Sequence, residues 1–240
     1  MREKRKLIIV DRKLPEEAKE KLSDYGKVAG IFTEGLAYPA ISGHPDIFFC
    51  KTPQVLVIAP NLPELYFRIL DQHLIRYEIG NLGVGVNGER KKVHHSAFIH
   101  YTAAVSDEYL VHTLQYTEPV ILQNCHYLKK IPVKQGYTRC NLLFLGKNHY
   151  LTSDTGIDET LKRHGFEGLF VSPEGIVLPG FQNGFIGGTI GIYGEKVFIT
   201  GSLQRFPQGR KVKNYLEALN YEIIELCDGP LMDAGGILFI

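Results

Sequence analysis

Two short stretches of the chain combine residue types that can carry nucleophilic and acid–base chemistry. His44 and Asp46 stand two residues apart, and Cys140 directly precedes Asn141. On an extended strand, residues two apart point the same way, so His44 and Asp46 could face one cavity together. A thiolate attacks electrophilic carbon while an imidazole moves the proton, so Cys140 and His44 could support covalent catalysis. The structural alternative makes Cys140 a small buried hydrophobic residue and His44 a turn residue. In that interpretation Asp46 and Asn141 hydrogen-bond to backbone at strand starts.

A wider set of polar residues could bind a ligand without transforming it. Asp46 and Asp233 supply negative charge suited to a guanidinium or an amine, and Arg139 can grip a carboxylate with two parallel hydrogen bonds. These residue types favour a small cationic or arginine-like ligand. The residues that we expect to line the binding cavity are His44, Asp46, Arg139, Asn141, Thr189 and Asp233.

The cysteines and histidines do not follow a metal-binding pattern. No Cys-x-x-Cys pair is present, and adjacent His94 and His95 on a strand would point to opposite faces, so they do not predict an ion shared with His100. We expect neither a metal nor a cofactor. Without a secretion signal, the four scattered cysteines are typical of reduced thiols; they are Cys50, Cys125, Cys140 and Cys227.

Composition narrows the classes of partner and the compartment. The 27 Lys and Arg residues nearly balance the 26 Asp and Glu residues among 240, so no global field favours nucleic acid or a membrane surface. No run of about 18 apolar residues exists, and the apolar run at 7–10 is too short for a signal peptide. These features predict a cytoplasmic protein that binds neither nucleic acid nor membrane.

An internal repeat organises the chain. The segment GYTRCNLLFLGKNHYLTSD at 136–154 matches GFIGGTIGIYGEKVFITGS at 184–202, with an offset of 48 residues. Both open with Gly-aromatic, place a small polar residue sixth, and run through two apolar strands joined by a turn. Looser copies centre on Asp46, Phe98 and Gly236, which completes five copies at a near-constant period with Asn141 and Thr189.

Each copy is followed by residues with helical spacing and then by a short extended piece. Predicted helices cover 15–22, 63–74, 118–130, 158–164 and 210–219, and extended pieces follow at 77–79, 131–133, 169–171 and 222–226. One unit is therefore strand, strand, helix, strand. The fifth hairpin has only its first strand, at 237–240, and residues 7–10 supply the missing partner. Pairing of these two strands closes the ring and leaves no bare sheet edge.

The expected fold is thus a single α/β domain over 1–240, with five ββαβ units around a pseudo-fivefold axis. The segments GYTRCN, GFIGGT and DGPLMDAGGILFI (228–240) resemble those of the pentein, or guanidino-group-modifying, fold, a five-bladed α/β propeller. The chain is most similar to an uncharacterised bacterial branch of that fold, of the clostridial type. Because the starts of five inner strands converge around the axis, we expect the predicted pocket at one mouth of the central channel.

The resemblance also implies which catalytic groups the chain has lost. Enzymes of this fold carry a nucleophilic cysteine as Gly-Gly-x-x-Cys in the fifth unit, and Phe239 occupies that position here. Their His-x-Asp pair in the fourth unit corresponds to Gly187 and Thr189. Phenylalanine can neither ionise nor attack, so we expect a pseudoenzyme that acts as a binding or regulatory protein.

Two alternatives remain open at the level of the sequence. One is an enzyme acting on a guanidine-containing small molecule, as a deiminase, hydrolase or amidinotransferase does, with its catalytic groups relocated to His44, Asp46 and Cys140. The other is an interaction protein that binds a protein partner through its surface, since the fold also includes an initiation factor that keeps ribosomal subunits apart. The sequence does not identify that partner.

Overall fold

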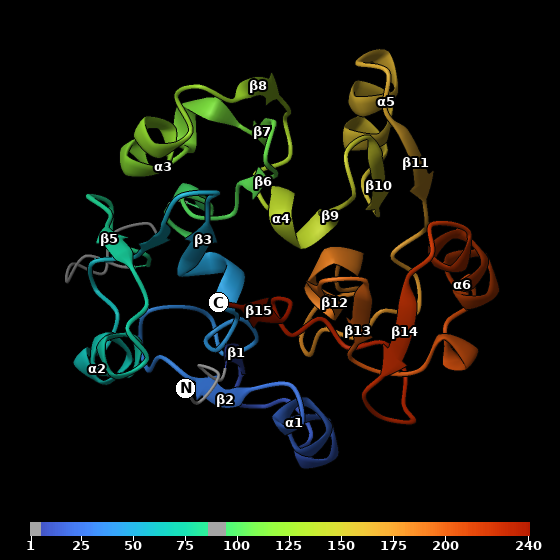
Figure 1. Ribbon diagram of the computed structural model, residues 1–240, viewed down its shortest axis with the longest axis horizontal. Helices are drawn as coiled ribbons and strands as arrows, with labels where there is room; N and C mark the ends of the chain where they lie inside the picture. Colours follow the sequence, from blue (N-terminus) through green and yellow to red (C-terminus); the bar gives the residue numbers. More distant parts are fainter. Residues whose placement is uncertain (1–5, 86–94) are drawn as a thin grey trace, which may run out of the picture.

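The computed structural model describes residues 6–85 and 95–240 and shows five three-stranded sheets arranged around a centre (Figure 1). Every sheet has an inner, a middle and an outer strand. In that order the strands are β15 (Leu238–Phe239), β1 (Leu7–Asp11) and β2 (Lys27–Ile31); β3 (Phe49–Lys51), β4 (Leu56–Ile58) and β5 (Tyr77–Ile79); β6 (Ala104–Val105), β7 (Tyr109–His112) and β8 (Lys129–Pro132); β9 (Leu142–Leu145), β10 (His149–Thr152) and β11 (Glu167–Phe170); β12 (Ile190–Tyr193), β13 (Lys196–Ile199) and β14 (Glu222–Glu225).

Each sheet is built in the same way. The inner strand pairs antiparallel with the middle strand, and the middle strand pairs parallel with the outer strand. A parallel pair needs a crossover connection, and a helix provides it in every unit. The crossover helices are α1 (Glu16–Ser23), α2 (Glu64–Gln72), α3 (Pro119–Asn124), α5 (Thr155–Arg163) and α6 (Gly209–Ala218). The predicted strand, strand, helix, strand unit is confirmed.

The two ends of the chain complete one sheet together, as predicted. Ile8 pairs with Phe239 and Ile9 pairs with Leu238. The Leu7 amide donates to the Ile240 carbonyl, and the Ile240 amide donates to the Leu7 carbonyl, both at 2.9 Å. This pairing closes the ring of five sheets.

Apolar residues fill the space between neighbouring sheets, and β1 shows how. Its residues alternate between two clusters: Ile8 and Val10 pack with Leu22 of α1, whereas Leu7 and Ile9 pack into a cluster on the other face. A strand that is buried on both faces is expected to be continuously apolar rather than alternating. This explains the run LIIV in the sequence.

Short helical turns precede the inner strands, and they correct one expectation. The turns are η1 (Pro45–Ile47), η2 (His95–Phe98), α4 (Thr138–Asn141) and η4 (Ile186–Thr189), with η3 (Leu114–Tyr116) and η5 (Leu203–Arg205) elsewhere. His44 and Asp46 were expected on one extended strand and therefore on one side. Pro45 instead begins a helical turn, which rotates Asp46 away from His44.

Strand register also changes which residues occupy equivalent positions in the repeat. The carbonyls of Asn141 and Thr189 accept hydrogen bonds from Ser153 and Thr200 at 3.1 and 2.9 Å. In the first unit the equivalent acceptor is Phe48, which bonds the Ala59 amide at 2.9 Å, so the position assigned to Asp46 was wrong by two residues.

In the second unit Thr102 occupies the position expected for Phe98. Its hydroxyl donates to the carbonyl three residues back, at 2.8 Å, as the hydroxyl of Thr189 does. The helix expected at 118–130 is also shorter, because 129–132 pair with β7 as strand β8.

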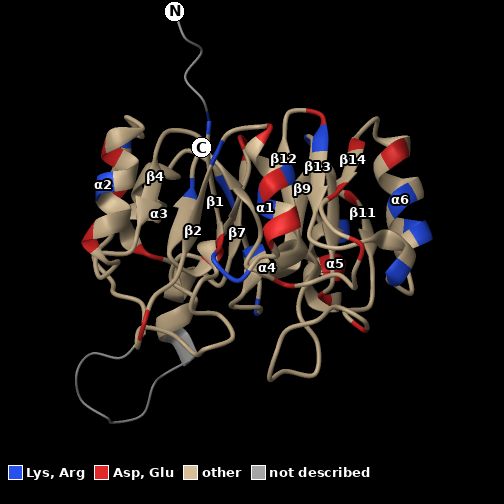
Figure 2. Cartoon of the chain, turned by 90° about the horizontal axis from the view of Figure 1, so that it is seen from below, with Lys and Arg blue, Asp and Glu red and all other residues tan. Residues whose placement is uncertain are grey.

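The ring has two distinct ends (Figure 2). Hairpin turns between inner and middle strands, together with the paired residues Leu7 and Ile240, lie at one end, called here the hairpin end. Connecting loops such as 32–44 and 171–185 lie at the other, called here the loop end. No helix within residues 6–85 and 95–240 is both long and apolar enough to cross a membrane.

Candidate functional site

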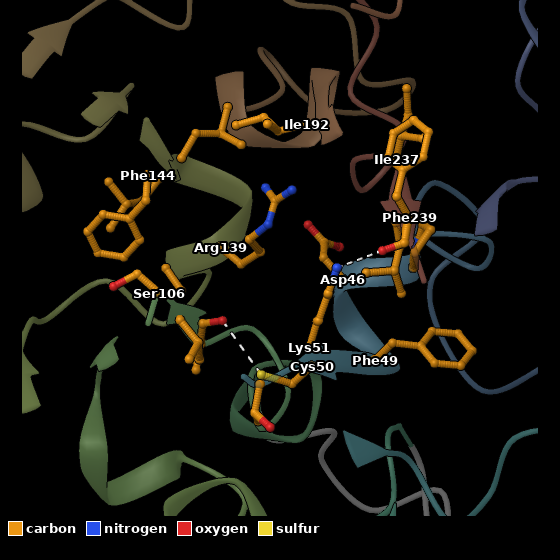
Figure 3. A pocket seen from close by; sticks show the side chains of 18 of the residues that line it. Asp46, Phe49, Cys50, Lys51, Ser106, Arg139, Phe144, Ile192, Ile237 and Phe239 are labelled. Carbon is orange, nitrogen blue, oxygen red and sulfur yellow. Dashed lines mark hydrogen bonds between the residues drawn. The ribbon is translucent and has the colours of Figure 1, made fainter. Parts of the chain in front are cut away.

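A cavity of about 290 Å³ occupies the centre of the ring and extends toward the hairpin end (Figure 3). Asp46 and Arg139, in the turns before the inner strands, line it at one extreme. Lys51 and the turn residues Ser106 and Asp107 line it toward the other. Its walls are mostly apolar and include Phe49, Leu142, Phe144, Ile192, Ile237 and Phe239.

The carboxylate of Asp46 is buried and receives no hydrogen bond of normal geometry from the described residues, although the neighbouring Cys140 thiol, a weak donor, is close enough to lower its pKa. Backbone geometry holds it there, because the Asp46 amide donates to the Gly235 carbonyl at 3.3 Å. Burial raises the pKa of Asp46 to about 7, and the nearby Asp233 carboxylate contributes in the same direction. A buried acceptor without a partner is costly, so its presence at a cavity needs an explanation.

Arg139 lies opposite Asp46 across the cavity (Figure 3). Its guanidinium donates to the carbonyls of Gly187 at 2.9 Å and Ile190 at 3.4 Å, which anchors it to the neighbouring unit. Its positive charge opposes the rise in the pKa of Asp46, but no ion pair joins the two within 4 Å. Arg139 therefore acts as a fixed positive charge in the wall.

Lys51 is a second cation of this cavity, and sequence reasoning missed it. Its ammonium donates to the Phe239 carbonyl at 2.8 Å (Figure 3). Burial lowers its pKa, and the charge of Lys6 lowers it further. An ammonium has three donors, so Lys51 keeps N–H groups for a ligand. Its sequence position gave no signal, because Lys51 is the last residue of strand β3 and polar residues end many strands at a surface.

The six predicted site residues do not share one cavity. Asp46 and Arg139 line the central cavity, but Asn141 and Thr189 are buried and bonded within their own turns. The side-chain amide of Asn141 donates through Nδ2 to the Tyr137 carbonyl at 3.0 Å, and its Oδ1 accepts from the Ser153 hydroxyl at 2.9 Å. The structure therefore distributes the six residues over two cavities and the turns between them, because Asn141 and Thr189 satisfy the turns at their strand starts. Ligand binding by the residues that do line a cavity stays a prediction.

His44 and Asp233 face a separate cavity at the loop end. The Asp233 carboxylate accepts hydrogen bonds from the amides of Phe185 at 2.8 Å and Gly235 at 3.1 Å. Burial raises the pKa of Asp233 to about 6, and burial lowers the pKa of His44 to about 4. Asp233 and Gly235 thus form part of a partition between the two cavities.

The thiol and imidazole proposed for relocated catalysis are not adjacent. Cys140 is fully buried, and its pKa is raised well above the ordinary value by burial and by the charges of Asp46 and Asp233. His44 instead lies between Asp11 and Asp233, with nitrogen–oxygen distances of 3.9 and 3.8 Å. A protonated, shielded thiol is a poor nucleophile, so this arrangement lacks the features of an activated cysteine.

The position expected for the family nucleophile is part of the apolar core. Phe239 stacks on Tyr193 with ring centroids 5.4 Å apart and contacts Phe198 at 4.9 Å. Gly187, at the position of the family histidine, has no side chain, and a β-carbon there would lie 2.4 Å from the Arg139 carbonyl oxygen. Packing rather than chemistry therefore explains both residues.

No cluster of three or more metal-ligating residues occurs in residues 6–85 and 95–240. His94 lies outside the described residues, and so does the side chain of His95. The His100 ring bonds the Tyr116 carbonyl at 2.7 Å. The described part of the chain thus offers no candidate metal centre.

Comparison with known proteins identifies the family of this chain and solved structures with a similar fold. The sequence model of a family described as a family of unknown function, DUF6873, matches residues 9–238. No curated protein matches the sequence. Three similar solved structures are a dimethylarginine dimethylaminohydrolase from Pseudomonas aeruginosa, a mutant complexed with citrulline (12% identity, TM-score 0.53, 92% of this chain and 91% of that chain); an agmatine deiminase from C. jejuni (11%, 0.54, 92% and 87%); and an amidinotransferase of saxitoxin biosynthesis from Microseira wollei (11%, 0.55, 93% and 78%).

These similarities confirm the pentein fold that the sequence predicted. At 11–12% identity they show the fold alone. Fold does not determine function, so any activity has to be argued from the cavity itself.

Proposed function

The chain belongs to the DUF6873 family, and we propose that it is a binding or regulatory protein that holds a small cationic, arginine-like molecule in its central cavity. The observation that carries this proposal is the Asp46 carboxylate, which is buried in the cavity wall with no cation within 4 Å and no donor at normal hydrogen-bond geometry among the described residues. A guanidinium or ammonium group placed there supplies both the donors and the opposite charge.

The Lys51 ammonium indicates which second polar group the ligand carries. Lys51 forms no ion pair within 4 Å among the described residues, although the charge of Asp107 acts on its pKa, and it lies toward the hairpin end, away from Asp46. A carboxylate near Lys51 and a cation near Asp46 match a molecule with opposite charges at its two ends. Arg139 was expected to hold the carboxylate, but it lies near Asp46, where the cationic end of the ligand is proposed to bind.

The chemistry of the cavity favours binding over turnover. Enzymatic attack on a guanidinium carbon needs a thiolate with a proton shuttle. Cys140 is held as a thiol, and His44 faces the other cavity. The second candidate, an enzyme acting on a guanidine-containing molecule, is supported only by the proximity of Cys140 to Asp46.

Calorimetric titration with arginine, agmatine and methylated arginines tests the proposal. We expect saturable binding that Asp46→Asn abolishes, and that Asp24→Asn, at an exposed position, leaves unchanged. Because agmatine lacks the carboxylate, Lys51→Met should weaken arginine and spare agmatine. Binding needs ionised Asp46, so affinity should rise roughly tenfold from pH 6 to pH 8, across its pKa of about 7.

An assay for citrulline and urea separates the two candidates. Absence of product with bound ligand supports a binding role. Turnover that disappears in Cys140→Ala would establish the relocated nucleophile instead. Failure of every ligand to bind at any pH between 6 and 8 would refute a guanidinium site at Asp46.

A further inference from the structure

The cavity at the loop end is separate from the proposed site and has a volume of about 550 Å³. Three parts of the chain converge on it: the end of β1, the residue before η1, and the segment before β15. They contribute Asp11, His44 and Asp233, of which 2%, 3% and 4% is exposed. Buried ionisable residues on the wall of a cavity are unusual, since charged groups are rarely buried without partners.

Neither acidic group of this cavity has a cationic partner. Within the described residues, His44 is the sole basic side chain within 4 Å of Asp11 or Asp233. The pKa of His44, lowered to about 4 by burial, leaves its ring neutral at pH 7. The nearby Lys13 ammonium bonds instead to the Pro39 carbonyl and lies 3.5 Å from the Ser42 hydroxyl.

One carboxylate oxygen in this cavity, Asp11 Oδ2, lacks a hydrogen bond within the described part of the chain. Asp11 Oδ1 accepts from the Lys13 amide at 2.8 Å, whereas Oδ2 accepts no hydrogen bond from the described residues. Among the described residues, the one basic side-chain atom within 4 Å of Oδ2 is His44 Nε2 at 3.9 Å, which is too long for a hydrogen bond. A nearly fully buried carboxylate therefore presents an unpartnered oxygen to a cavity that it lines.

The rest of this cavity is lined by Lys13, by Gly180 and by apolar side chains. Pro39, Ala40, Pro179, Met232 and Ala234 form its walls. Val177 and Phe181, in the same loop as Pro179, are 42% and 54% exposed. Apolar walls with a few convergent polar groups are typical of small-molecule sites.

We propose that the loop-end cavity is a second ligand site, which takes an organic cation with an apolar body. The ammonium or amidinium group donates to Asp11 Oδ2 and is attracted by Asp233. The apolar body packs against the proline, alanine and methionine walls. This site differs from the central cavity because, among the described residues, two carboxylates, those of Asp11 and Asp233, face it with a single lining ammonium, that of Lys13, so its net charge favours a cation.

Phenethylamine is a suitable probe because it has one ammonium, an aromatic body and no carboxylate. Its binding to the full chain can be followed by calorimetry and by NMR titration. We expect Asp11→Asn to weaken binding at least tenfold. Ala40→Phe, which fills the cavity and keeps both carboxylates, should do the same. Asp46→Asn, in the central cavity, should change the affinity less than twofold.

The outcome is decisive in either direction, provided that melting curves show each variant to be folded. If Asp11→Asn does not fold, loss of phenethylamine binding in Ala40→Phe alone supports the loop-end site. Equal loss in Asp46→Asn would assign the probe to the central cavity and overturn the proposal. Absence of saturable binding by the unmodified chain, or unchanged binding in both loop-end variants, would overturn it as well. Neither result bears on arginine binding at Asp46, which has its own test.

Discussion

At the scale of single residues, the centre of the ring concentrates ionisable groups whose pKa values burial has moved toward their neutral forms. Asp46 and Asp233 have raised pKa values of about 7 and 6, and His44 has a lowered value of about 4. Neutral forms are favoured because desolvation penalises charge. Burying these ionisable groups destabilises the unliganded protein, which is a reason to expect ligands beside them. Because their pKa values differ between the folded and unfolded states, they also make the free energy of unfolding depend on pH.

Replacing Asp46 by Asn should stabilise the unliganded protein above neutral pH. The folded carboxyl keeps its proton up to about pH 7, whereas the unfolded carboxyl loses it near 3.8. Between these values the unfolded state binds fewer protons, so this group lowers stability progressively as pH rises and fully above pH 7. The variant should gain about 1–4 kcal/mol at pH 8 and nearly nothing at pH 4. Urea unfolding at several pH values measures this; a pH-independent difference would contradict the assignment.

Cys140 should resist alkylation in the native protein. Burial and the neighbouring carboxylates raise its thiol pKa, and only the thiolate reacts with iodoacetamide. Cys227, which is only half-buried, should be modified first. Peptide mass spectrometry after timed labelling at pH 8 gives the order of reaction. Labelling of Cys140 ahead of Cys227 would indicate an activated thiol and favour the enzymatic alternative.

At the scale of elements, the turns before the inner strands decide what the centre contains. Sequence patterns were sufficient for the hairpins, because pairs of apolar strands joined by short turns recur at a near-constant period. They were also sufficient for the closing pair β1–β15. Sequence patterns failed at Asp46. Side chains two residues apart point the same way only on a strand, and Pro45 begins a helical turn instead.

The sequence likewise could not identify Lys51 or Asp11 as cavity residues. Lys51 ends the inner strand β3 and Asp11 ends the middle strand β1. A polar residue at the end of an apolar strand is common at any surface, so its type alone carries little information. Only the arrangement of five sheets brings Lys51 to the cavity that Asp46 lines.

Glycines allow these turns to approach one another, and Gly188 is the tightest case. A β-carbon at Gly188 would lie 1.8 Å from Asp233 Oδ1. The Gly235 amide holds this oxygen in place, and the Phe185 amide holds Oδ2 of the same carboxylate. Gly188→Ala should therefore destabilise the protein by about 2–4 kcal/mol, since the partition cannot relax without breaking those bonds. Gly229→Ala is the matched control, because nothing lies within 4 Å of its β-carbon. Urea denaturation curves of both variants should differ clearly; equal stability would show that the partition is pliable.

At the scale of the whole molecule, the ring stays closed because every sheet pairs its own three strands and packs against its neighbours. The sheet shared by the two ends of the chain is the one place where closure depends on a contact distant in sequence. Loss of an inner strand elsewhere would break a local hairpin, whereas loss of β15 opens the ring. Stability and oligomeric state should therefore both respond to changes at β15.

Removal of residues 237–240 should bring the protein close to unfolding. Ile237 and Phe239 are 3% and 4% exposed, and large buried side chains contribute about 1.5–3 kcal/mol each. With the half-buried residues beside them, the loss reaches roughly 4–8 kcal/mol, comparable to the whole stability of a typical domain. The deletion also frees the edge of β1, which invites pairing with another chain. Phe239→Ala keeps the strand and serves as the comparison, with a loss of about 3–5 kcal/mol and no association. Thermal melting and light scattering distinguish the two variants, and a truncated chain that melts like the full one as a monomer would show that β15 does not close the ring.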